Sequence, residues 1–151
     1  MNVIAMIPAR YNASRFPGKL MKNLGGKPVV LRTYEAVLHT KLFDEVYIVT
    51  DSDIIFETII NAGGRAIMSK KVHECGSDRI AEAVENMNAD VVINVQGDEP
   101  FIDKISLSKL IDVFKRDVKK EIDLASLKVQ ITSKEEIENP NIVKVITDVN
   151  N

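Results

Sequence analysis

Apolar residues fall into short runs along this chain, and their spacing predicts alternating strands and helices. Apolar and β-branched runs predict strands at residues 3–7, 45–50, 65–68, 91–95, 124–129 and 142–147. Apolar residues at helical spacing predict helices at about 28–38, 53–62, 76–87 and 103–118, and a short helix after Ser133. This alternation indicates an α/β fold with a doubly wound, mostly parallel sheet and helices on both faces.

The ends of the predicted helices carry start and stop signals. Pro28 suits a first helical turn, and the pair 63–64, both glycines, ends the second helix. Asp103 and Ser133 can accept capping hydrogen bonds. The β-branched run at 91–95 indicates a central strand buried on both faces. Apolar residues expected on the inner faces of the helices are Val30, Tyr34, Val37, Leu38, Ile80, Ala81, Val84, Met87, Leu107, Leu110, Ile111, Phe114 and Val118.

The stretch 6–19 breaks this pattern directly after the first strand. Two prolines and a glycine interrupt regular structure, and Arg10, Arg15 and Lys19 place cations on a loop at the carboxyl end of the strand. Ligands of open α/β sheets bind at that edge. Arg offers phosphate a fork of donors and Lys a mobile charge, so the loop suits a polyanion, above all a triphosphate. The alternative is an ordinary solvated surface.

A carboxylate follows the run 91–95, in the turn Gln-Gly-Asp-Glu-Pro. Asp98 would stand beside the loop 6–19 at the same sheet edge, where it can ligate a hard divalent cation such as Mg²⁺. The alternative is that Asp98 and Glu99 are ordinary turn or cap acids.

The run from His73 to Arg79 is a third candidate for ligand binding. Gly76 permits close approach of backbone, and Ser77 can cap a helix whose exposed amides favour an anion. Arg79 would point toward the same cleft. Cys75 with His73 could instead form a nucleophilic pair, but two residues this close in sequence, with no third group to orient them, are a poor geometric case.

Composition excludes several classes of protein. The net charge is -2 with cations and anions interspersed, so no basic face indicates a nucleic-acid partner. The single cysteine excludes an internal disulfide and a cysteine-cluster metal site. No signal pattern and no apolar run near the roughly 20 residues of a membrane span occur, so we expect a cytoplasmic protein without a membrane partner. Neither a P-loop nor a dinucleotide-binding fingerprint is present.

The pattern Ile-Pro-Ala-Arg-Tyr, Ser-Arg and Pro-Gly-Lys within 7–19 resembles the signature loop of the sugar-activating cytidylyltransferases. It is most similar to the 3-deoxy-manno-octulosonate (Kdo) cytidylyltransferases. The segment 94–100, Asn-Val-Gln-Gly-Asp-Glu-Pro, also matches that family. The segment 75–79 is similar to its Ser-Gly-(Ser/Thr)-(Asp/Glu)-Arg, with Cys75 in place of the serine. Further matches lie at 50–51, which could equally be a helix cap, and at 139–144, so the resemblance covers nearly the whole chain.

The resemblance implies one nucleotide-binding domain over residues 1–151 with a Rossmann-like fold. It implies that the loop wraps the phosphates of CTP, that Arg10, Lys19 and Asp98 act in catalysis, and that Asp98 binds Mg²⁺. Residues implied to bind the nucleotide are Pro8, Ala9, Arg10, Lys19, Ser77, Arg79 and Gln96. The Gln96 amide has a donor and an acceptor for the edge of cytosine, although it could equally be a buried amide bonded to backbone.

The implied activity is transfer of CMP from CTP to the anomeric hydroxyl of Kdo, with release of pyrophosphate, for lipopolysaccharide biosynthesis. Family members continue for about a hundred further residues, the scale of a domain. That part is implied to supply the sugar-acid pocket, a second metal-binding aspartate and much of a homodimer interface. Three alternatives stay open: a cytidylyltransferase for another 2-keto sugar acid such as sialic acid, a truncated CTP-binding module without activity, and an interaction domain without a ligand.

Overall fold

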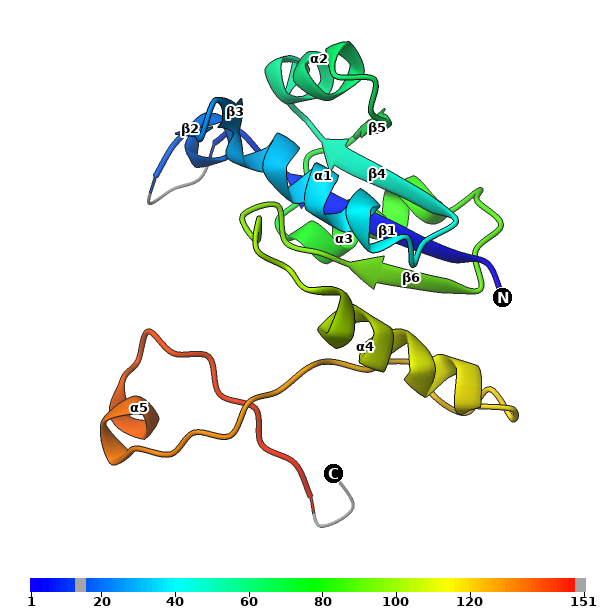
Figure 1. Cartoon of the computed structure of the whole chain (residues 1–151), viewed down its shortest axis with the longest axis vertical. Helices are drawn as coiled ribbons and strands as arrows, with labels where there is room; N and C mark the ends of the chain where they lie inside the picture. Colours follow the sequence, from blue (N-terminus) through cyan, green and yellow to red (C-terminus); the bar gives the residue numbers. More distant parts are fainter. Residues whose placement is uncertain (13–15, 149–151) are drawn as a thin grey trace.

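A parallel sheet forms the centre of the computed structural model, which describes residues 1–12 and 16–148 (Figure 1). Its four strands are β1 (Val3–Ala9), β4 (Glu45–Thr50), β5 (Ala66–Met68) and β6 (Val91–Asn94), in the order β5-β4-β1-β6. The helices are α1 (Val29–Thr40), α2 (Asp53–Asn61), α3 (Gly76–Val84), α4 (Lys104–Arg116) and α5 (Lys134–Glu138). A 3-10 turn, η1 (Lys19–Met21), precedes a small antiparallel pair, β2 (Asn23–Leu24) and β3 (Lys27–Pro28).

Strand β1 is the centre of the core, and all seven of its residues are buried. It pairs in parallel with β4 on one side and with β6 on the other. Because side chains alternate along a strand, Ala5 and Ile7 pack with α1, α2 and α4 on one face, whereas Ile4 and Met6 pack with α3 on the opposite face. Helices therefore cover both faces of a parallel sheet, and the predicted fold class is confirmed.

Strand β6 does not occupy the predicted central place. It pairs only with β1 within the described residues, and its burial alternates, with Val91 and Ile93 buried but Asn94 exposed. The prediction of a central strand was wrong, because a β-branched run reports the preference for strand geometry and not the place of the strand in the pairing order. Val92 does pack on the face opposite to Val91 and Ile93.

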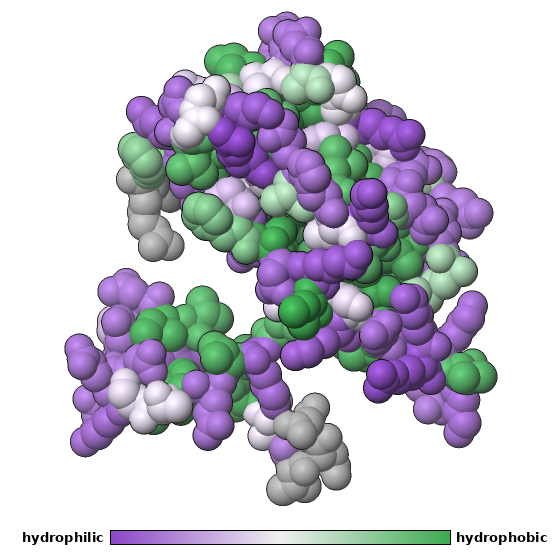
Figure 2. Space-filling model, in the orientation of Figure 1, coloured by the Kyte–Doolittle hydropathy of each residue, from purple (hydrophilic) through white to green (hydrophobic). Residues whose placement is uncertain are grey.

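The strands predicted at 124–129 and 142–147 are also wrong. Both segments are irregular, and no residue from 112 to 148 is buried. The chain from Leu124 onward lies apart from the sheet (Figure 1). Figure 2 shows apolar side chains on the surface of this part, and Leu124, for example, is 87% exposed. An alternating pattern becomes a strand only where a neighbouring strand pairs its backbone groups, and the structure places none beside these residues.

The predicted caps are formed at two helices. Asp103 Oδ1 accepts from the Ser106 amide at 2.9 Å, and Ser133 Oγ accepts from the Glu136 amide at 3.1 Å. Pro28 precedes α1 as its N-cap residue instead of lying in its first turn, so that placement was wrong.

Three residues predicted to face the core do not do so. Leu38 and Ala81 are exposed, and Val118 is 90% exposed beyond the end of α4. Ala83 packs against the sheet instead of Ala81. Only residues three or four positions apart share one face of a helix, so Ala83 lies on the same side of α3 as the buried Ile80. No described helix is both apolar enough and long enough to cross a bilayer.

The difference between the layered core and the segment 117–148 predicts unequal effects of one substitution. Ile111 is 1% exposed in the core, whereas Ile146 is 95% exposed. We expect Ile111→Ala to lower the free energy of unfolding by about 2–5 kcal/mol and Ile146→Ala to change it by less than about 0.5 kcal/mol. Urea denaturation followed by circular dichroism measures both. Equal losses would show that residue 146 is buried in solution, contrary to this structure.

Candidate functional site

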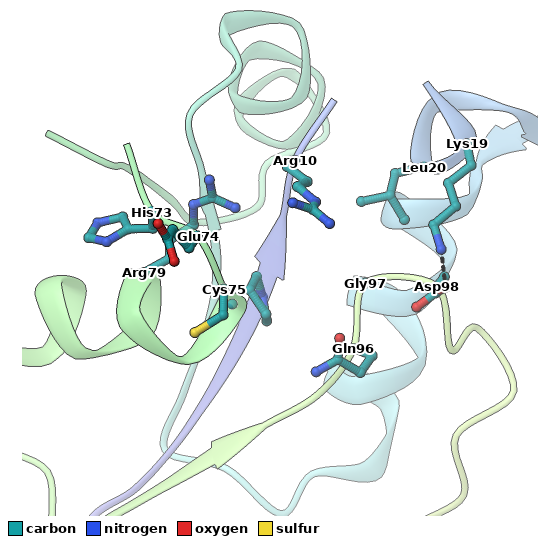
Figure 3. Close-up of a pocket in the computed structure, with 12 residues that line it drawn as sticks. Arg10, Lys19, Leu20, His73, Glu74, Cys75, Arg79, Gln96, Gly97 and Asp98 are labelled. Carbon is teal, nitrogen blue, oxygen red and sulfur yellow. Dashed lines mark hydrogen bonds and ion pairs between the residues drawn. The ribbon is translucent and has the colours of Figure 1, made fainter. Parts of the chain in front are cut away.

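A cleft of about 350 Å³ opens at the carboxyl ends of β1 and β6, beside the first turn of α3 (Figure 3). Three segments far apart in the sequence form it: the end of β1 with η1, the loop before α3, and the turn after β6. The residues that line it are Pro8, Arg10, Lys19, Leu20, His73, Glu74, Cys75, Gly76, Arg79, Gln96, Gly97 and Asp98.

Pro8 is the point against which two of these segments pack. A Cβ on Gly76 would lie 3.0 Å from Pro8 Cγ, and one on Gly97 would lie 3.1 Å from the Pro8 carbonyl oxygen. A side chain at either position would therefore have to displace its neighbour by a few tenths of an ångström. Thr33 of α1 also donates a buried hydrogen bond of 2.9 Å to the Gly97 carbonyl. The two turns are therefore held in fixed positions around the end of β1.

Arg10 is the first residue after β1, and its exposed side chain points into the cleft (Figure 3). Its guanidinium makes no ion pair or hydrogen bond with the residues that the structure describes. Across the cleft, the amide of Gly18 donates to the Tyr11 carbonyl at 2.8 Å and closes the loop, and Gly18 adopts φ +68° to lead into η1. The predicted cation Arg15 lies outside the described residues.

Lys19 and Asp98 form an ion pair inside the cleft. The Lys19 ammonium lies 2.5 Å from Asp98 Oδ2, and each side chain is a little under half exposed. The hydrogen bond from Lys19 holds the pKa of Asp98 below its ordinary value, although partial burial acts in the opposite direction. Asp98 is therefore ionised at neutral pH. The Lys19 ammonium that is paired with it could instead bind another anion, if one entered the cleft.

Gln96 and the first turn of α3 line the opposite part of the cleft. The Gln96 amide nitrogen donates to Asn94 Oδ1 at 3.2 Å, and its side chain reaches into the cleft (Figure 3). Cys75 is the N-cap of α3, because its Sγ accepts from the Asp78 amide at 3.5 Å. The prediction that Ser77 caps this helix was wrong. Ser77 is exposed and does not line this cleft, and Ala9 is buried in the core.

Arg79 lines the cleft, but one carboxylate and one hydroxyl already bind its guanidinium. It is 3% exposed and donates to Asp51 Oδ2 at 2.6 Å and to Ser69 Oγ at 3.2 Å. A buried charge needs such partners. Arg79 thus joins α3 to the ends of β4 and β5. The sequence pointed to Asp51 only as a possible cap or family match, and its place at the end of a strand was the signal for this role.

The structure gives the Cys75 and His73 pair no catalytic geometry. His73 Nε2 is bonded to Glu82, and Glu82 Oε1 also accepts from the Lys70 amide at 2.7 Å. Sequence reasoning missed Glu82, because its contacts join a helix to a loop whose path the sequence does not reveal.

Asp98 could hold Mg²⁺ together with a bound nucleotide, but not in a site made of the described side chains alone. The described residues contain no cluster of three or more His, Cys, Asp or Glu side chains that could hold a metal. Mg²⁺ in nucleotide sites commonly takes one or two carboxylates together with phosphate oxygens and waters. An ionised carboxylate beside the cations of the cleft suits an arrangement of that kind.

Comparison with known proteins shows the family of this chain. The sequence profile described as Cytidylyltransferase matches residues 4–151. A 3-deoxy-manno-octulosonate cytidylyltransferase of Christiangramia forsetii is 67% identical over 145 residues, which are 96% of this chain and 58% of that protein. The protein of the same name from Flavobacterium johnsoniae is 62% identical over 148 residues, 98% of this chain and 61% of that protein. The chain thus spans about three fifths of the length of these relatives.

Solved structures agree with this similarity. CMP:2-keto-3-deoxy-manno-octonic acid synthetase complexed with CTP superposes with a TM-score of 0.74 at 37% identity, over 78% of this chain and 48% of that one. A cytidylyltransferase from Leptospira borgpetersenii has a TM-score of 0.68 at 24% identity, over 78% of this chain and 50% of that one, and so shares the fold. The predicted resemblance is confirmed. The roles assigned to individual residues stay predictions.

The ion pair predicts how Asp98 titrates. Because the Lys19 hydrogen bond lowers the pKa of Asp98, Lys19→Met should raise that pKa toward or above the ordinary aspartate value. NMR titration of the Asp98 carboxyl carbon measures it. Lys22→Met is the matched control, since Lys22 lies over the Phe16 ring, 5.6 Å from its centre. An unchanged pKa in Lys19→Met would show that the ion pair is not formed in solution.

Proposed function

Because this chain belongs to the cytidylyltransferase family, we propose that it serves the transfer of CMP from CTP to Kdo, with release of pyrophosphate, in lipopolysaccharide biosynthesis. The observation that carries the proposal is the convergence of Arg10 and Lys19, from the end of β1 with η1, and Asp98, from the turn after β6, on one cleft at the edge of a parallel sheet. The names of the relatives at 62 and 67% identity favour Kdo over sialic acid as the acceptor.

We place the triphosphate at the charged end of the cleft and the nucleoside at the other. Arg10 is unpaired among the described residues and offers phosphate its fork of donors. Gln96, Gly76 and the capped start of α3 form the other end, where an amide can read a base edge and backbone can approach closely. We assign no described residue to the sugar acid.

In the proposed reaction the anomeric hydroxyl oxygen attacks the α-phosphorus of CTP. A new bond forms between that oxygen and phosphorus, the bond to the bridging oxygen of the β-phosphate breaks, and pyrophosphate leaves with the electron pair. The hydroxyl proton passes to solvent. Such a step depends on in-line positioning and on neutralising phosphate charge. Lys19 would neutralise the α-phosphate and Arg10 the outer phosphates.

Lys19 has to leave Asp98 for this reaction. Its ammonium is bonded to the carboxylate that we propose as the ligand of Mg²⁺. When bound, Mg²⁺ would polarise the phosphates and offset their charge. Entry of the nucleotide with its metal would let Lys19 exchange the carboxylate for a phosphate oxygen and free Asp98 for the cation, so the two charges change partners without either becoming isolated.

A CTP-binding module without turnover is the second candidate. It is favoured by one observation, namely that the described residues hold no cluster of acids around Asp98. We further propose a homodimer in the cytoplasm without a nucleic-acid or membrane partner, as expected from the family resemblance and from the interspersed charges and single cysteine of the sequence.

The test of the proposed function is pyrophosphate release with CTP and Mg²⁺, with Kdo and sialic acid offered in turn, and calorimetric CTP binding on the same sample. We expect CTP binding, and release with Kdo only. Arg10→Ala should weaken CTP binding about tenfold or more, because it removes charge-assisted hydrogen bonds. Arg116→Ala, in the last turn of α4, is the control. Binding without release would support the second candidate, and no CTP binding would contradict both.

Asp98→Asn separates the role of the metal from that of charge. We expect it to abolish most of the gain in CTP affinity that Mg²⁺ gives the unmodified protein, because a neutral amide is a poor ligand for this cation. Without metal, CTP should bind the variant at least as tightly, since a carboxylate near the phosphates has been removed. Calorimetry with Mg²⁺ and with chelator measures both affinities, and a retained magnesium effect would rule out Asp98 as the ligand.

A further inference from the structure

The loop between β5 and α3, residues 69–75, forms one wall of the cleft. It supplies His73, Glu74 and Cys75 to the lining, next to Gly76 at the start of α3 (Figure 3). The loop has no strand or helix of its own. Its position therefore depends on the contacts that hold it to the neighbouring elements.

Contacts at its two ends tie this loop to the sheet. The Ser69 amide donates to the Thr50 carbonyl at 2.8 Å, and Ser69 Oγ accepts from Arg79. At the far end, Gly76 packs closely against Pro8, whose Cγ would lie 3.0 Å from a Cβ at position 76. These end contacts do not involve residues 70–75, which lie between them.

Glu82 holds the middle of the loop. It lies on α3, and its carboxylate accepts from the Lys70 amide through Oε1 and from His73 Nε2 through Oε2. An ionised carboxylate can only accept, so Nε2 carries the hydrogen of that bond. The side chains of His73 and Glu82 are 11 and 15% exposed, which shields the contact from solvent. The bond from His73, followed by the one from Lys70, keeps the pKa of Glu82 below its ordinary value.

We propose that Glu82 is a positioning residue, which folds the loop 69–75 back onto α3 and so sets the wall that the nucleoside contacts. The inference rests on the proposed function, namely that the cleft binds CTP. Glu82 itself does not line the cleft. Arg10, Lys19 and Asp98 stand on other segments, so the triphosphate end keeps its geometry when the contact of Glu82 is lost.

This division gives the proposal a specific signature. Loss of the Glu82 contact weakens binding of the whole nucleotide. The loop then has to become ordered when CTP binds, and the free energy of that ordering is subtracted from the binding free energy. It leaves the affinity for inorganic triphosphate unchanged, because that ligand contacts only the charged end. A residue that merely stabilised the fold would change the unfolding midpoint and affect both ligands alike.

The experiment compares CTP and inorganic triphosphate, each with Mg²⁺, by calorimetry on the unmodified protein and on Glu82→Gln. We expect CTP affinity to fall about tenfold, with the triphosphate affinity and the midpoint of urea unfolding nearly unchanged. Glu85→Gln is the matched control, because it makes the same change in charge at the exposed C-terminal end of α3 and should change neither affinity.

His73→Leu removes the same contact from the loop side, because leucine has no donor for the Glu82 carboxylate. It should reproduce the loss of CTP affinity, and the double variant should lose no more than either single one. Unchanged CTP affinity in both single variants, or an equal loss for both ligands, would overturn the role of Glu82 while leaving the proposed function standing. Failure of the unmodified protein to bind CTP would overturn the proposed function and this inference with it.

Discussion

Burial of β1 on both faces is the constraint on which the rest of the structure depends. The strand is packed between helices and lies between two parallel neighbours, so its carboxyl end can move little. Gly76, at the start of α3, and Gly97, in the turn after β6, pack against Pro8 at that end, where a Cβ on either glycine would make a contact of only 3.0 or 3.1 Å. A rigid strand thus fixes loops from three distant segments around one cleft, which is how open α/β sheets build ligand sites.

Within that cleft, two cations are neutralised by acids of the chain. Lys19 is bonded to Asp98 at the accessible end, and the buried Arg79 is bonded to Asp51. The two pairs differ in what they can do. The half-exposed pair of Lys19 and Asp98 can open toward an incoming polyanion at modest cost. Separating the second pair would leave the buried Arg79 guanidinium without its carboxylate. Exchange of partners is therefore expected at Lys19 and structural support at Arg79.

The sequence anticipated the parts of the molecule that depend on local pattern. The strand at 45–50 and the caps at Asp103 and Ser133 formed as predicted, because their signals lie within a few neighbouring residues. The segments 124–129 and 142–147 failed for the opposite reason. Their alternation describes a strand that would need a neighbouring strand, and the structure gives neither segment strand geometry.

By itself, the sequence determined the fold class, the family and the residue types of the cleft, because hydrophobic periodicity and the motifs around Arg10, Lys19 and Asp98 are written in contiguous letters. Only the tertiary structure decided which strand lies in the centre, that Cys75 rather than Ser77 caps α3, and that Glu82 holds a loop of the cleft. Those outcomes depend on contacts between residues brought together by packing, and no local pattern in the chain specifies which partners meet.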